Sequence, residues 1–299
     1  MTKFIQTIII GLEYGCVYSL IAMGMVLVYR TTGVLNIAHG GVGVLAGFVA
    51  WDLVQLRGWP YYPGLLAGVA FAVVLGLAFE RFVVRRLPNA GSRTVATLGL
   101  FLLAQGVVFA VPWWSNNSAQ VFPSPFTGKT VRIPGADYAV SYDQILLLVT
   151  VGLLFVGLRF MLRRTRIGMA MRAVSDDPSA SRLMGVREEL VSPVVWAMAF
   201  AIAALSVMLI APVNLLENTS IVAFTLKALA VTFVGGLVSL PLTVLGATIL
   251  AFLEAFTQIY AADVRGLPSA WPFLLMVAVL VVRLIRPTKA LDEQALATA

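Results

Sequence analysis

The stretch FIQTIIIGLEYGCVYSLIAMGMVLVY, residues 4–29, decides the class of this protein. It carries one charged residue, Glu13, and is longer than the roughly 20 apolar residues that cross a bilayer as a helix. The apolar core of a secretory signal peptide is shorter, roughly 7 to 15 residues, and precedes a small-residue cleavage site. The stretch therefore predicts a first membrane-spanning helix.

Similar apolar runs recur along the whole chain, of which 60% is hydrophobic and 12% charged. They cover residues 4–29, 34–54, 62–84, 95–111, 142–161, 190–211, 221–238, 242–260 and 271–284. Backbone polar groups in lipid must be satisfied within their own segment, so we expect each run to be helical. The sequence predicts an all-α polytopic transmembrane bundle, a single domain over residues 1–299, with about 8–10 spanning segments and one or more broken helices.

The distribution of Lys and Arg predicts the orientation. Fifteen of the 21 basic residues follow the first, third, fifth and last runs, and so fall on one face when crossings alternate. Positively charged short loops stay in the cytoplasm, so we expect the N-terminus outside and the C-terminus inside. The segment 112–141 is then an external loop, 159–189 a cytoplasmic loop and 286–299 a cytoplasmic tail.

The cytoplasmic loop 159–189 is too polar to enter lipid and longer than a simple turn. Residues 165–174 are typical of a short amphipathic helix, and Asp176, Asp177 and Pro178 can begin a second one that ends near Gly185. Two short helices at the membrane face form a protrusion that a soluble partner can bind. The alternative is a solvated charged segment that only anchors two spanning helices.

Three motifs carry a resemblance to a known family. The segment GMAMRA, residues 168–173, followed by Asp176, Ala180 and Gly185, resembles the coupling loop of the branched-chain amino acid permeases of ABC importers, the LivH type. The segment YRTTGVLNIAHG, residues 29–40, is similar to an early motif of that family, and the glycine-rich stretch 227–246 to a late one. The resemblance covers nearly the whole chain.

The resemblance implies a transport subunit without an ATPase site of its own. In that family a permease pairs with a second permease, here expected to be a different chain of the LivM type, on two cytoplasmic ATPases that hold ATP and Mg, and an external binding protein delivers the substrate. It implies residence in the bacterial cytoplasmic (inner) membrane and no nucleic-acid partner. The residues it assigns to the ATPase-coupling loop are Gly168, Arg172, Ala173, Asp176, Ala180 and Gly185.

A second group of residues interrupts apolar surroundings with polar or flexible positions. Polar side chains at membrane depth are costly unless they face water or a partner, so we expect a substrate pathway or hinge there. The group comprises Gly33, Asn36, His39, Gly40, Gly41, Gly235 and Gly236. The alternative is that Asn36 caps the second helix at the membrane surface. His39 is the one histidine and has no second ligand beside it, and the single Cys16 excludes a cysteine cluster, so we expect no metal site.

Glu13, Lys227 and Glu254 are the ionisable residues set deepest in apolar runs, where an acid and a base can pair between helices. They also leave open a different function, an ion-coupled carrier that needs no ATPase. Within the ABC reading, urea, short amides or aromatic acids are alternatives to branched-chain amino acids as substrates. No paired carboxylates, activated nucleophile or metal cluster point to an enzyme, so we expect no catalytic residue.

Overall fold

The computed structural model describes residues 2–115, 119–132, 139–186, 188–264 and 266–285. The predicted cytoplasmic tail 286–299 therefore lies outside the described residues. The helices are α1 (Thr2–Thr32), α2 (Ala38–Trp51), η1 (Asp52–Leu56), α3 (Tyr61–Phe82), η2 (Val84–Arg86), α4 (Ala90–Ala110), α5 (Pro112–Ser115), α6 (Tyr142–Arg164), α7 (Arg166–Asp176), α8 (Pro178–Leu183), α9 (Glu188–Asn214), α10 (Asn218–Val234), α11 (Leu240–Tyr260) and α12 (Leu267–Ile285). The strands β1 (Thr130–Arg132) and β2 (Ala139–Ser141) form one antiparallel hairpin.

Each of the nine predicted runs contains a helix, and the all-α polytopic fold is confirmed. Within the described ranges, 7 helices are long and apolar enough to cross a membrane: α1, α2 with η1, α3 with η2, α4, α6, α9 and α11. The two remaining runs correspond to shorter apolar helices, α10 and α12. The predicted start of the second run was wrong, because residues 33–37 form a non-helical break and α2 begins at Ala38.

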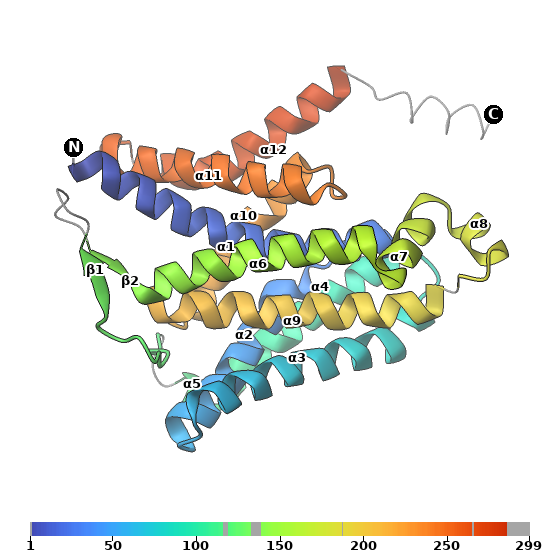
Figure 1. The fold of residues 1–299 in the computed structure, drawn as a ribbon, viewed down its shortest axis with the longest axis horizontal. Coiled ribbons are helices and arrows are strands. Elements are labelled where there is room, and N and C mark those ends of the chain that lie inside the picture. Colours follow the sequence, from blue (N-terminus) through green and yellow to red (C-terminus); the bar gives the residue numbers. More distant parts are fainter. Residues whose placement is uncertain (1, 116–118, 133–138, 187, 265, 286–299) are drawn as a thin grey trace.

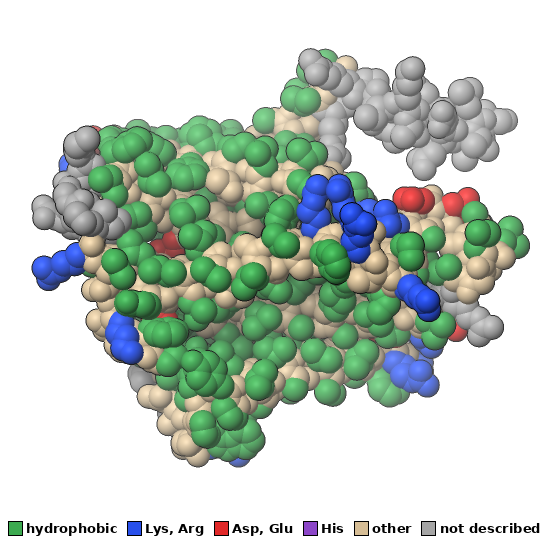
Figure 2. All heavy atoms as spheres, in the orientation of Figure 1, with side chains coloured by type: hydrophobic (Ala, Val, Ile, Leu, Met, Phe, Trp, Pro, Cys, Tyr) green, Lys and Arg blue, Asp and Glu red, His purple; other side chains and the backbone are tan. Residues whose placement is uncertain are grey.

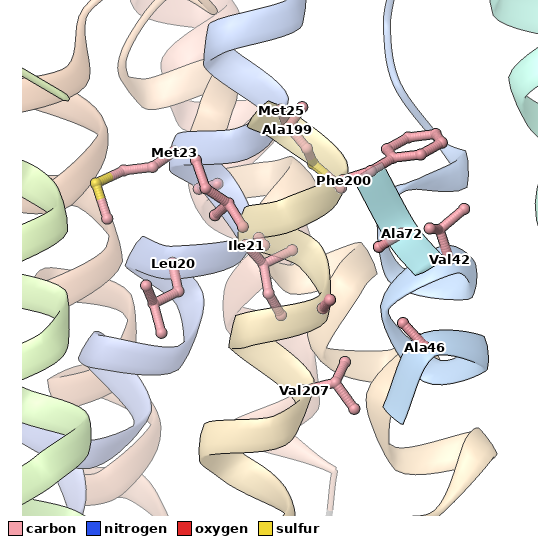
Figure 3. Close-up of a cluster of buried hydrophobic side chains, with 14 of the residues drawn as sticks. Leu20, Ile21, Met23, Met25, Val42, Ala46, Ala72, Ala199, Phe200 and Val207 are labelled. Carbon is pink, nitrogen blue, oxygen red and sulfur yellow. The ribbon is translucent and has the colours of Figure 1, made fainter. Parts of the chain in front are cut away.

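Helix α2 lies at the centre of the bundle. It contacts α1, α3, α4, α9 and α10, and every one of its residues except Val49 is buried. Figure 3 shows the apolar core on two of its sides, where Val42 and Ala46 of α2 lie near Ala72 of α3 and Val207 of α9. A central helix of this kind touches other helices rather than lipid, so its side chains are selected by packing.

Small residues spaced four apart allow the helices to approach closely. A β-carbon on Gly43 of α2 would lie 2.6 Å from the Ala203 carbonyl oxygen of α9. One on Gly11 of α1 would lie 2.7 Å from the Phe252 ring of α11. These glycines therefore serve packing within the chain.

The two ends of the bundle differ in structure and charge. The β1–β2 hairpin and the start of α1 lie at one end, and α7 and α8 protrude at the other (Figure 1). Lys and Arg side chains gather on the visible face near α7 (Figure 2). The expected cytoplasmic basic residues Arg30, Arg85, Arg93 and Arg182 line pockets at the α7–α8 end. The predicted external loop is thus at the opposite end from the predicted coupling loop.

Candidate functional site

The break between α1 and α2 is held by side chains of a third helix. The backbone N–H groups of Leu35 and Ile37 donate to the hydroxyls of Thr94 and Thr97 of α4, at 3.2 and 3.1 Å, and the Thr97 hydroxyl also lies 3.0 Å from the Leu35 carbonyl oxygen. Gly33 starts the break with φ +66°, a conformation that glycine adopts without steric cost. Backbone groups released from helical bonding are therefore paired inside the bundle, as lipid requires.

The start of α2 packs against α1 well before the C-terminal end of that helix. The His39 imidazole packs directly against Gly24, where a β-carbon would overlap the ring. Gly24 is eight residues before the end of α1 at Thr32, a rise of about 12 Å along a helix. Gly40 packs against Thr225 of α10, and a β-carbon on Gly41 would lie 2.9 Å from the Phe101 ring of α4. The three glycines create the space that lets α1, α4 and α10 close around the start of α2.

Asn36 and His39 are both buried inside the bundle. Their exposed fractions are 1% and 0%. Neither the side-chain amide of Asn36 nor either imidazole nitrogen of His39 has a partner among the described residues. The capping interpretation of Asn36 is wrong, since the residue before α2 is Ile37 and no side chain caps the helix. Unpaired buried polar groups cost about 1–3 kcal/mol each, so this arrangement calls for another explanation.

Lys227 and Glu254 form the expected pair between helices. The Lys227 ammonium on α10 lies 2.9 Å from a Glu254 carboxylate oxygen on α11, and their side chains are 23% and 3% exposed. The Tyr18 hydroxyl on α1 donates to the same carboxylate oxygen at 2.5 Å. The Lys227 ammonium also lies 3.2 Å from the Tyr18 hydroxyl. The three side chains therefore tie α1, α10 and α11 together.

Glu13 lies apart from that pair. Its carboxylate accepts a hydrogen bond of 2.7 Å from the Gln144 side chain at the start of α6. Both residues line a mainly apolar groove between α1 and α6. The sequence flagged Glu13 with Lys227 and Glu254, but the structure places it in a separate contact.

Two buried carboxylates at the ends of the bundle were missed. Glu80 is 2% exposed and lies 3.6 Å from the Arg85 guanidinium. Asp52 is 8% exposed and lies 3.5 Å from the Arg57 guanidinium. Each has its arginine five residues further along the chain, and that spacing was the available signal. We interpret both as ion pairs that stabilise the end of a helix.

The predicted coupling segment folds as two short helices. The Thr165 side chain accepts from the Gly168 N–H at the start of α7, and Asp177 accepts from the Ala180 N–H at 2.9 Å at the start of α8. Gly168 packs so closely on the Met161 carbonyl of α6 that a side chain would not fit. The two-helix form and its Asp cap agree with the sequence prediction, and the coupling role stays a prediction.

The residues assigned to coupling divide between two faces. Gly168 is buried, and Arg172 and Ala173 are half-buried against the bundle. Asp176, Ala180 and Gly185 are exposed. The sequence reasoning missed the two most exposed apolar side chains of the segment, Leu183 at 91%, the last residue of α8, and Met184 at 83%, the first residue after it. We call these two residues the tip of α8. Their exposure depends on the fold of the segment, so no local pattern marks them.

The glycine pair Gly235–Gly236 forms the turn between α10 and α11. Gly235 packs against Thr243, and Gly236 and Leu237 both have positive φ, +66° and +64°. The glycine pair thus lets the chain leave the end of α10 and turn back into α11. No group of three or more potential metal-ligating residues occurs in the part of the chain that the structure describes.

Comparison with known proteins agrees with this architecture. The family model described as "Branched-chain amino acid transport system / permease component" matches residues 7–284. The chain is 29% identical to the high-affinity branched-chain amino acid transport system permease protein BraD of Pseudomonas aeruginosa, over 97% of this chain and 96% of BraD. It is 25% identical to LivH of Escherichia coli K12, a permease protein of the same description, over 97% and 96% of the two chains.

A more distant likeness extends to another transport subunit. The ribose import permease protein RbsC of Escherichia coli K12 is 26% identical over 81% of this chain and 75% of RbsC. The match of the family model over nearly the whole chain, with near full-length relatives, fits the helical bundle and its protruding segment. The chain belongs to the family of branched-chain amino acid transport system permease components.

Proposed function

We propose that this chain forms half of the membrane pathway of an ATP-driven importer for branched-chain amino acids. The observation that carries the proposal is the tip of α8, where Leu183 and Met184 are almost fully exposed beyond the end of the bundle. Large apolar side chains outside the membrane mark a surface that a protein partner covers. Relatives described as branched-chain amino acid permease proteins supply the substrate class.

The partner at the α8 tip is an ATPase subunit in this proposal, and the α7–α8 end faces the cytoplasm. The excess of arginine at that end supports this orientation. The importer would then contain two ATPases that carry ATP and Mg, a second permease and an external binding protein. Since Gly168 seats α7 directly on the end of α6, a displacement of the α8 tip is passed to a spanning helix.

The pathway lies beside Asn36 and His39 in this proposal. A closed state buries their polar groups, and a state in which α1 and α10 move apart exposes them to water or substrate. The zwitterionic head of an amino acid provides both donors and acceptors for an amide and an imidazole. The free energy lost in the closed state is then recovered when the pathway opens.

The test replaces the apolar tip of α8. Leu183→Asp combined with Met184→Asp is introduced into the transporter purified with its partner subunits and reconstituted in liposomes. We expect uptake of leucine to fall at least tenfold, because an apolar contact with the ATPase is lost. The control is Leu284→Asp, since Leu284 is 82% exposed at the end of α12, away from α8.

The readouts separate assembly from coupling. ATPase activity stimulated by the binding protein is measured beside uptake, and the subunit composition is checked by size-exclusion chromatography. Unchanged uptake in the α8 double variant contradicts the proposal. Uptake that continues without ATP and stops with a protonophore would instead establish the ion-coupled carrier.

A further inference from the structure

One cavity at the α7–α8 end of the bundle is lined by four arginines. It has a volume of about 700 Å³ and lies among the ends of α1, α6, α7 and α11. Its basic residues are Arg30 from α1, Arg159 and Arg163 from α6, and Arg172 from α7. The N-terminal residues of α11, from Ser239 to Pro241, complete the wall. Three helices thus bring four positive charges to one cavity.

The positive charge in this cavity is not neutralised within the described part of the chain. Asp176 is the one acidic residue in its lining. No carboxylate among the described residues lies within 4.0 Å of any of the four guanidinium groups. The Arg172 Nε is buried and unpartnered, while its Nη2 lies 3.5 Å from the Arg163 carbonyl oxygen. Arginines brought together without counter-charges repel one another, so the cavity favours an anion.

The form of the anion follows from the position of the cavity. It lies where membrane-spanning α1 and α6 end and α11 begins, the depth at which lipid phosphates are found. Next to the cavity along the two spanning helices lie exposed apolar side chains. On α6 these are Val156 and Phe160, both 62% exposed, and on α11 they are Leu242 and Leu245, 52% and 55% exposed. Those apolar side chains suit acyl chains that continue from a head group. A free phosphate would use the arginines but not the apolar faces.

We propose that this cavity binds the phosphate head group of an anionic phospholipid, such as phosphatidylglycerol. Guanidinium groups bind phosphate through paired hydrogen bonds. The bound lipid joins α7 to α1, α6 and α11. Arg172, which the family resemblance assigns to the ATPase-coupling loop, then faces a lipid on the inner side of α7.

The test measures lipid binding directly on the transporter with its partner subunits. Native mass spectrometry follows phosphatidylglycerol bound during titration into the detergent-purified complex, with phosphatidylcholine as the neutral comparison. The variant Arg159→Gln with Arg163→Gln is compared with Arg164→Gln, an exposed arginine on the same end of α6 that does not line the cavity. We expect about fivefold weaker binding for each lining arginine removed. Arg164→Gln should bind as the unmodified chain does.

Each alternative outcome overturns the proposal. Equal phosphatidylglycerol affinity in the double variant and the unmodified chain means that the lipid binds elsewhere. Inorganic phosphate that binds with the same arginine dependence, while phosphatidylglycerol does not, would establish a soluble anion as the ligand. Lipid binding that appears only after the ATPase subunits are removed would mean that an acidic group of the ATPase fills the cavity. None of these results depends on transport, so the coupling proposal and the lipid proposal can fail separately.

Discussion

Two sets of polar side chains lie inside the bundle, and they differ in how they are satisfied. Lys227, Glu254 and Tyr18 bond to one another and link α1, α10 and α11. Asn36 and His39 are also buried, and none of their side-chain polar atoms has a partner among the described residues, whereas in the first set only the Glu254 Oε1 lacks one. Lys227, Glu254, Asn36 and His39 stand out in the sequence as polar residues in apolar runs, and Tyr18 does not.

This difference indicates which set belongs to a part of the protein that changes conformation. The Lys227–Glu254 ion pair and the Tyr18 hydrogen bond hold their helices in one arrangement, because separating them would leave charges unpaired at membrane depth. Unpaired groups instead favour any arrangement that gives them partners. We therefore regard the Lys227 network as a fixed clamp and the start of α2 as the part that changes state. Cys16, the single cysteine and 6% exposed, permits this to be tested, since a thiol-reactive dye labels it on unfolding.

The largest expected effect is on the clamp. Lys227→Met leaves the Glu254 carboxylate buried without its cation, and we expect a loss of about 3–5 kcal/mol in stability. Thermal labelling of Cys16 measures the shift. Lys129→Met, at an exposed lysine of the hairpin end, is the control. Adding Glu254→Leu should recover most of the loss, and no recovery would contradict a direct pair.

The opposite sign is expected at the start of α2. His39→Leu removes two buried nitrogens that have no partners, so we expect a gain of about 2 kcal/mol in the same labelling assay. Leucine uptake should fall at least tenfold, because the polar group is needed in the open state. His39→Gln, which keeps polar atoms, should retain part of the uptake. A loss of stability in His39→Leu would show that the imidazole is satisfied in the closed state.

A smaller effect tests the packing of that region. Gly24→Ala forces the added methyl group into the His39 ring, and we expect a loss of about 1.5 kcal/mol. Gly99→Ala is the matched control, because nothing lies within 4 Å of a β-carbon there. Combining Gly24→Ala with His39→Ala should restore stability by making room. Equal effects at Gly24 and Gly99 would disprove the close contact.

The smallest expected effect concerns the support of the break. Thr97→Val removes the hydroxyl that bonds Ile37 and Leu35, and we expect a loss of about 1 kcal/mol. Thr248→Val is the comparison, since the Thr248 hydroxyl donates to the Val244 carbonyl of its own helix and bonds to no other described residue. Thermal labelling of Cys16 measures the loss of stability in each of the two variants. If both cost the same, α4 does not hold the break in place.

The sequence predicts most of the fold because its information is local. Each apolar run is longer than a soluble strand or turn, and the Asp177 cap depends on neighbours three residues away. The contacts that define the candidate sites are not local. The Tyr18–Glu254 bond joins residues 236 positions apart, and Thr94 and Thr97 look like ordinary helical threonines until the break lies beside them. Gly24, an isolated glycine in a long apolar run, was the available clue to a side chain packed against α1.

The central position of α2 also bears on how the chain is made. Among the seven long spans, the α2–η1 segment has the lowest mean hydropathy, 1.2, and the largest buried share, 72%. The ribosome delivers it well before α9 and α10, whose residues begin at Glu188 and Asn218 and cover it in the finished bundle. Until α9 and α10 have been synthesised, this glycine-rich helix, which has weak affinity for lipid, lacks its final neighbours. Insertion factors that shelter half-made membrane proteins should therefore associate longest with nascent chains that end between α2 and α9.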